Sequence, residues 1–249
     1  TSYDGEINSS GSIPFDLNLG SKNLGKLFSD DTLDFDIDSK MKKLSFLTPY
    51  ISDLDSVIGN FHMSLSLSGY PNNIQRKGKF SVENGQMYSM HLSDPIKALN
   101  GEAVIKKNIL TIDQISAIVY NPSSNYIEQK KPNTQIVGTV DLTQFFKPKY
   151  DLSIKAKDAS YELLSVDISG LANIDVKISG RDTVEVSGKI ESIDAKVFYE
   201  FNTEEIGTAI DDNGIVMSYN LNIPLRSSAF FQNSQIDAEL LGEINLSQK

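Results

Sequence analysis

Apolar and polar side chains alternate with period two along most of this chain. In the stretch FHMSLSLS, the residues Phe61, Met63, Leu65 and Leu67 share one parity, and a histidine and three serines share the other. Successive side chains of a β-strand point to opposite faces, so the pattern predicts strands with one apolar and one polar face. Two later stretches alternate in the same way. The residues expected to line a common apolar interior are Phe61, Met63, Leu65, Leu67, Ile174, Val176, Ile178, Val184, Val186 and Ile190.

Short turn signals rich in Gly, Asn and Pro separate these runs, for example after Gly69, around Gly85 and after Gly180. Such spacing is typical of hairpins and favours antiparallel pairing. The glycines also permit the bulges that a curled sheet requires. We therefore predict an all-β fold, an antiparallel sheet of stacked repeats with an apolar interior; that the sheet is long and curled is what the family resemblance given below implies. About 18 strands at about 4.8 Å spacing would give a groove of roughly 85 Å.

Three stretches break the period of two and predict short helices instead. Apolar residues in 41–57 recur every three to four positions, although Pro49 interrupts them. Weaker helical patterns cover 158–165 and 203–210.

The chain also contains a degenerate internal repeat. Residues 59–87 resemble residues 172–197, because each has an alternating strand that ends in Ser-Gly, a polar turn, and a second strand containing Gly-Lys. Repeats of this kind stack and bury what their neighbours expose. We expect one elongated segment over 1–249, with repeat-like units at about 57–120 and 136–200 and a last unit at about 215–246. The chain starts at Thr1 without a leader, which indicates a piece of a longer protein.

The composition argues against several classes of function. The net charge of −10, from 33 acidic and 23 basic residues, opposes nucleic-acid binding. The absence of cysteine excludes thiolate metal sites, thiol catalysis and disulfides. His62 and His91 are the only histidines, and no nucleophile, phosphate-loop or metal-ligand motif is present. The Asp-Asp-Asn-Gly stretch at 211–214 is interpreted as a β-turn, since it lacks the glutamate of a calcium loop. We therefore predict a protein that is not an enzyme and has no catalytic residues, metal or cofactor.

Two long segments resemble the TamB/AsmA-like envelope proteins, in particular the C-terminal β-repeat region of translocation and assembly modules. The first runs from LTPYISDLDSVIGNFHMSLSLSGYPNNIQRKGKFSVENGQM through ALNGEAVIKKNILTIDQI, and the second is VMSYNLNIPLRSSAFFQNSQIDAELLGEINL. Together the resemblance covers about 33–246.

The resemblance implies a taco-shaped β-groove in the periplasm, spanning between the inner and outer bacterial membranes. It implies that the groove carries or binds phospholipid acyl chains and supports outer-membrane biogenesis. The implied partners are an outer-membrane TamA-like barrel protein and the inner membrane, reached through an N-terminal region missing from this chain. Acyl chains gain about 0.8 kcal/mol per buried CH₂ and need no directed hydrogen bonds, which suits a chain without catalytic residues.

Three alternatives remain open at this point. The apolar faces could pack on one another as a β-sandwich or barrel core. Exposed sheet edges could instead capture a client strand by β-augmentation, as in an assembly chaperone for outer-membrane or autotransporter proteins. The repeats could also form an extracellular fibre or adhesin.

Overall fold

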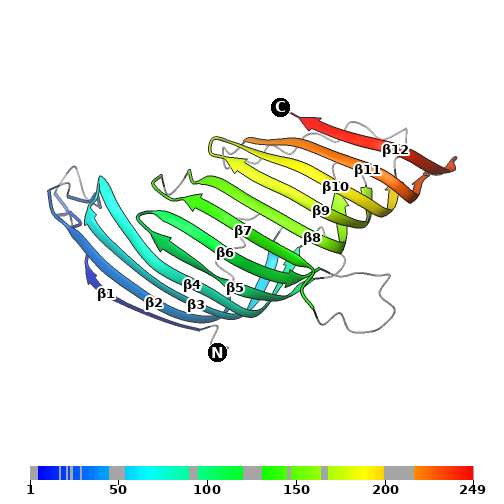
Figure 1. Cartoon of the computed structure of the whole chain (residues 1–249). Coiled ribbons are helices and arrows are strands. Elements are labelled where there is room, and N and C mark those ends of the chain that lie inside the picture. Colours follow the sequence, from blue (N-terminus) through cyan, green and yellow to red (C-terminus); the bar gives the residue numbers. More distant parts are fainter. Residues whose placement is uncertain are drawn as a thin grey trace.

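The described part of the chain forms one sheet of twelve strands, arranged in the order in which they occur in the sequence (Figure 1). The computed structural model describes residues 5–16, 18–20, 22, 25–28, 30–44, 54–89, 95–119, 131–144, 147–163, 168–198 and 216–248. The strands are β1 Gly5–Ser12, β2 Leu33–Lys43, β3 Leu54–Tyr70, β4 Asn73–Ser89, β5 Ile96–Lys106, β6 Ile109–Ile118, β7 Thr134–Asp141, β8 Lys149–Leu163, β9 Ile168–Gly180, β10 Thr183–Phe198, β11 Val216–Gln232 and β12 Asp237–Gln248.

Ten of the eleven pairings are antiparallel, and the pairing of β10 with β11 is parallel. Thr183 at the start of β10 lies opposite Val216 at the start of β11. The sequence led us to expect antiparallel pairing only, so this pair is a correction. Its consequence is that β12 runs in the same direction as β1.

Directly opposed residues form an unbroken row across all twelve strands, which we call the ladder. It contains only apolar residues and glycine. Its members, from β1 to β12, are Gly5, Met41, Phe61, Val82, Gly101, Ile115, Ile136, Ile154, Val176, Gly188, Leu221 and Leu246. Opposed residues of paired strands project from the same side of a sheet. The apolar parities of the separate strands therefore combine into one continuous apolar face.

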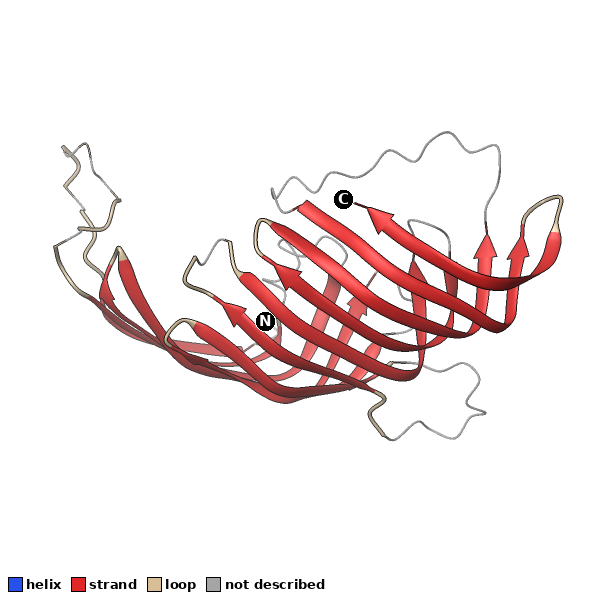
Figure 2. Cartoon of the chain, turned by 45° about the horizontal axis from the view of Figure 1, so that its top comes forward, coloured by secondary structure: helices blue, strands red, loops and turns tan. Residues whose placement is uncertain are grey.

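The long strands bend part-way along their length, so that the sheet forms an open trough (Figures 1 and 2). Register shifts occur between most neighbouring strands, with β1–β2 and β7–β8 as exceptions, and we call the line that they form across the sheet the crease. The shifts lie at Met41/Lys43, Ile58/Asn60, Val82/Gly85, Lys97/Asn100, Ile112/Ile115, Ala156/Ala159, Ser192/Asp194 and Leu225/Ala229. A bulge adds a residue to one strand and bends it, so a row of bulges bends the whole sheet.

Two glycines on the apolar face show why these positions exclude larger residues. Gly138 in β7 and Gly188 in β10 have φ angles of 137° and 136°, which side chains rarely adopt. A Cβ atom at Gly188 would lie 2.3 Å from the backbone oxygen of Asp175, and one at Gly138 would lie 2.2 Å from that of Asp151. Glycine therefore allows the neighbouring backbone to approach where the sheet curls.

Within the described residues, every substantial contact between strands joins neighbours in the sheet. No second sheet packs on the apolar face there, which excludes the β-sandwich alternative for this part of the chain. The prediction of an all-β, long curled sheet is confirmed. The described residues form twelve strands where about 18 were expected over the whole chain, and five of the twelve are 15 to 17 residues long. Twelve strands correspond to a trough of roughly 50 Å.

The predicted helices are wrong wherever the structure describes them. Residues 41–43 belong to β2 and 54–57 to β3, while Leu44 donates its backbone N–H to the oxygen of Val57 at 2.9 Å. Residues 158–163 belong to β8. The remaining parts, 45–53 and 164–165, and the third candidate at 203–210 lie outside the described residues. The described part of the chain has no helix that could span a membrane.

Candidate functional site

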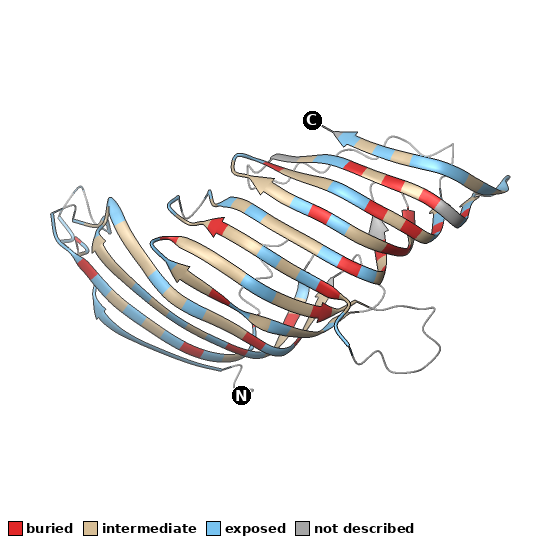
Figure 3. Cartoon of the chain, viewed as in Figure 1, coloured by how far each residue is buried: buried red, intermediate tan, exposed pale blue. Residues whose placement is uncertain are grey.

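The apolar face lines the inside of the trough, because only that side of a bent single layer can shelter side chains. Phe61, Val82 and Val176 on the ladder are buried, whereas their chain neighbours His62 and Lys177 are exposed. Figure 3 shows buried and exposed residues alternating along the strands across the sheet. The inside of the trough is the candidate functional site.

Buried side chains gather into two clusters, one near each end of the trough. The N-terminal cluster comprises Leu44, Val57, Phe61 and Val82, with Met41, Phe80, Met87 and Leu99 packed against them. The rings of Phe61 and Phe80 stack with their centroids 6.2 Å apart. The C-terminal cluster spans β8 to β12 and includes Tyr161, Ile168, Val176, Ile190, Leu221, Ile223 and Leu225.

Between the clusters, over β5 to β8, seven large aliphatic side chains belong to neither cluster and are half-buried: Ile105, Leu110, Ile112, Ile115, Ile136, Leu152 and Ile154. They project from the same side as the ladder, since Leu110 lies opposite Ile105 and Ile136 lies opposite Ile154. Val140 and the small residues Ala103 and Ala156 in this section are buried. This middle section therefore keeps part of its apolar surface accessible.

The structure places all ten predicted interior residues on this one face. The row Leu65, Gly78, Ile105, Leu110, Val140, Tyr150, Gly180, Val184 joins the residues predicted on β3 to those predicted on β10. Phe61, Val176, Val184 and Ile190 are buried. The other six, Met63, Leu65, Leu67, Ile174, Ile178 and Val186, are half-buried.

Small residues fill the inner side of the crease. Ala159 lies opposite Ala172, Ala172 lies opposite Ser192, and Ala195 lies opposite Ala229; the four alanines are completely buried. The Tyr161 hydroxyl lies 3.4 Å from the Ser192 hydroxyl. Burial raises the pKa of Tyr161 above its ordinary value of 10.0, against the opposing effect of this hydrogen bond. Burial also raises the pKa of Tyr150. Both shifts are consistent with an apolar environment inside the trough.

The outside of the trough is polar and carries pairs of opposite charge between neighbouring strands. Lys79 pairs with Glu102 at 2.7 Å and Lys177 with Asp151 at 2.9 Å, and all four side chains are largely exposed. Asp34, Asp36 and Asp38 also lie on this exposed face, and Asp36 accepts a hydrogen bond from the Ser66 hydroxyl. The outer surface of the trough is therefore in contact with water.

The described residues contain no cluster of His, Asp and Glu that could hold a metal ion. His62 is exposed on the polar face. His91 and the Asp-Asp-Asn-Gly stretch at 211–214 lie outside the described residues.

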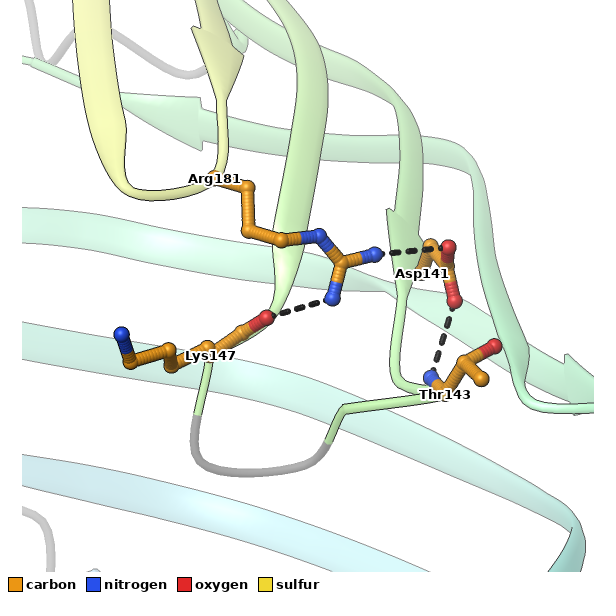
Figure 4. Close-up of polar contacts among 4 residues, drawn as sticks. All are labelled: Asp141, Thr143, Lys147 and Arg181. Atoms are coloured by element: carbon orange, nitrogen blue, oxygen red, sulfur yellow. Dashed lines mark hydrogen bonds and ion pairs between the residues drawn. The ribbon is translucent and has the colours of Figure 1, made fainter.

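A partly buried arginine connects two neighbouring loops at one rim of the trough (Figure 4). Arg181, in the turn between β9 and β10, donates to the backbone oxygen of Lys147 at 2.7 Å and to Asp141 at 2.9 Å. Asp141 also accepts from the backbone N–H of Thr143 at 2.8 Å. Hydrogen bonds from the Thr143 hydroxyl and N–H, with a smaller effect of Arg181, lower the pKa of Asp141 below its ordinary 3.8. The contacts join the β7–β8 loop to the β9–β10 turn.

A separate hollow of about 680 Å³ lies among β1 to β4. Its lining combines the ladder residues Gly5, Met41 and Phe61 with polar side chains that include Lys40, Lys42, Glu6 and Glu83. These four charged residues are exposed. The hollow reaches only four strands and most of its lining residues are polar, whereas the apolar face of the trough continues over all twelve, which is why the trough is the candidate site.

Sequence reasoning missed the middle of the site. It did not assign Ile105, Leu110, Ile112, Ile136 or Ile154 to the interior. A signal was present in part, because Ile136, Gly138 and Val140 alternate with polar or smaller residues. In β6 the crease places Ile112 and Ile115 on the same face despite their spacing of three, so the alternation is broken there.

Comparison of the chain with protein-family models, with curated proteins and with solved structures found no match. The geometry of the trough is therefore the basis of the functional proposal.

Proposed function

We propose that the chain is a segment of a TamB/AsmA-like periplasmic envelope protein whose trough holds phospholipid acyl chains. In this proposal the trough carries lipid between the inner and outer membranes together with a TamA-like barrel partner, and it supports outer-membrane biogenesis without catalysis. The observation that supports the proposal is the ladder, which keeps an apolar surface continuous over all twelve strands.

Two physical arguments support an apolar chain as the ligand. An exposed apolar strip is costly in water, and an acyl chain would cover it with a gain of about 0.8 kcal/mol per buried CH₂. The middle section over β5 to β8 supplies mainly aliphatic side chains, with the Tyr150 hydroxyl as a polar group on the same face. A lipid tail can slide along such a surface, because most positions along it are aliphatic.

The first test is native mass spectrometry of the gently purified chain, with extraction and identification of bound lipid. We expect co-purified phospholipid. A stable protein that carries no lipid and takes up none from vesicles would contradict the proposal.

A matched pair of substitutions locates the lipid on the inside of the trough. Leu65→Asp places a charge on the apolar face, where it is costly without a partner, and should abolish bound lipid. His62→Asp places the same charge on the exposed outer face of the same strand, opposite Lys40, and should leave lipid binding intact. Circular dichroism establishes that both variants are folded. Equal lipid content in two folded variants would exclude the inside of the trough as the binding surface.

The assembly-chaperone function remains the second candidate, favoured by one specific observation. All eight residues of the edge strand β1 are exposed, so its outer backbone groups are accessible to another strand. Binding of an extended client peptide in the lipid assay, with loss of bound lipid, would favour this function over transport.

A further inference from the structure

The first and last strands of the sheet share a sequence and a side-chain contact. β1 begins Gly-Glu-Ile-Asn-Ser-Ser at Gly5, and β12 contains Gly-Glu-Ile-Asn-Leu-Ser from Gly242. In β1, the Asn8 amide donates to Glu6 at 2.9 Å, and in β12, the Asn245 amide donates to Glu243 at 3.2 Å. The glycines that open the two stretches have similar φ angles of 152° and 135°.

The two strands also have the same orientation. The single parallel pair, β10 with β11, makes β12 run in the direction of β1. Gly5 and Leu246 are the two ends of the ladder, so equivalent residues of β1 and β12 face the inside of the trough. No other described strand pairs with the outer edge of β12, and this edge corresponds to the one through which β1 pairs with β2. In a sheet of twelve strands with antiparallel pairs only, β12 would run the opposite way.

We propose that the outer edge of β12 pairs with β2 of a second copy of this chain, taking the place of that copy's β1. Transferring the β1–β2 register to β12 places Glu243 opposite Lys40, Asn245 opposite Asp38 and Leu246 opposite Ile37. The exchange preserves the backbone pairing of β2. It also improves one contact, because β1 presents Ser9 to Ile37 and β12 presents Leu246.

β1 is suited to being displaced. It has only eight residues, all of them exposed, and neither buried cluster includes any of them. The resulting contact is head-to-tail, so it extends the trough instead of closing a symmetric dimer. The inference does not depend on lipid transport.

Cysteine crosslinking in the full-length chain tests this pairing without background, because the chain has no cysteine. One copy carries Asn245→Cys and the other, distinguished by a mass tag, carries Asp38→Cys. Directly opposed residues of antiparallel strands have Cα atoms about 4.5 to 5.5 Å apart, within the range that a disulfide bridges. In a glutathione buffer we expect heterodimers to exceed both homodimers several-fold.

Two further variants keep the test decisive. In the first variant, Glu239→Cys replaces Asn245→Cys, so that the thiol of β12 no longer lies opposite position 38. The yield of heterodimer should then fall several-fold. A double substitution Ile7→Pro and Asn8→Pro in the Asp38→Cys copy removes a backbone donor facing β2 and should raise the yield. Because neighbouring residues point their N–H groups to opposite sides, one of the two prolines acts on the β2 side.

Three outcomes would overturn the proposal. These are equal yields for Asn245→Cys and Glu239→Cys, a dominant Asn245→Cys homodimer, or no heterodimer with and without the prolines. If the proline variant does not fold, a synthetic peptide with the sequence of 33–43 and Asp38→Cys serves as the probe for the full-length Asn245→Cys chain. Failure of that peptide to crosslink preferentially at position 245 would also overturn it.

Discussion

At the scale of single residues, the trough depends on positions where no side chain fits. Gly188 combines a φ of 136° with a neighbouring strand so close that a Cβ would lie 2.3 Å from the Asp175 backbone oxygen. We expect Gly188→Ala to destabilise the fold by about 2 to 4 kcal/mol, from backbone strain and the displacement of β9. Urea unfolding measures the loss. Gly20→Ala is the control, because a Cβ there would meet only the Asn18 side chain at 3.5 Å; similar losses at both sites would contradict the argument.

Arg181 provides a second prediction at this scale, and it includes a pH dependence. Arg181→Ala removes the hydrogen bonds to Asp141 and to the Lys147 backbone, with an expected loss of about 1 kcal/mol at pH 7. The folded-state pKa of Asp141 is lowered, so its stabilising charge is fully present above pH 3.8 and is lost as the pH falls through the folded-state value. The difference between wild type and variant, measured by urea unfolding, should therefore narrow below about pH 3.8. Lys177→Ala, which removes an exposed ion pair, should cost less than about 0.5 kcal/mol.

At the scale of elements, the bulges of the crease are held by asparagine side chains on neighbouring strands. Asp158 has a φ of 49° within the β8 bulge, and its N–H donates to the Asn173 side chain in β9 at 3.1 Å. In β4, Asn84 has a φ of 50° and its N–H donates to the Asn100 side chain in β5 at 2.8 Å. The same hydrogen bond, from a bulge N–H to an asparagine side chain on the next strand, thus occurs at two distant points of the crease.

Asn173→Ala tests this role. We expect a loss of about 1 kcal/mol in urea unfolding, because the Asp158 N–H loses its acceptor at a residue with unfavourable backbone angles. Asn8→Ala in the exposed edge strand is the control and should change stability by less than about 0.5 kcal/mol. Equal effects at the two positions would show that the bulge does not depend on this hydrogen bond.

The crease also explains what sequence reasoning could and could not predict. On either side of the crease, the alternation of apolar and polar residues correctly predicted which side chains lie on the apolar face. Leu65 in β3 and Val184 in β10, for example, were both predicted to face the interior, and both do. At the crease, each bulge adds a residue, so the apolar parity continues from Ala156 to Ala159 with a spacing of three. That spacing resembles the period of a helix, which is why 158–163 was wrongly predicted as helical. The parallel pair had no local signal, because strand direction depends on a connection and not on alternation.

At the scale of the whole molecule, stability should differ along the trough. Each described strand contacts mainly its neighbours in the sheet, so stability is set locally by each strand and its neighbours. The C-terminal cluster buries far more apolar surface than the edge strand β1, whose residues are all exposed. Hydrogen exchange followed by mass spectrometry should show fast exchange in β1 and the slowest exchange in β9 to β11. Equal protection of β1 and β9 would indicate a single cooperative unit instead.

A sheet without a second layer also has an unusual freedom to change in evolution. Duplicating or deleting one hairpin would alter the trough by two strands, roughly 10 Å, while every remaining strand kept its direction and its face. The cross-section would stay the same, because within the described residues each strand contacts only its neighbours in the sheet to any substantial extent. Duplication or deletion of hairpins within the gene can therefore change the length of the trough during evolution without changing its cross-section.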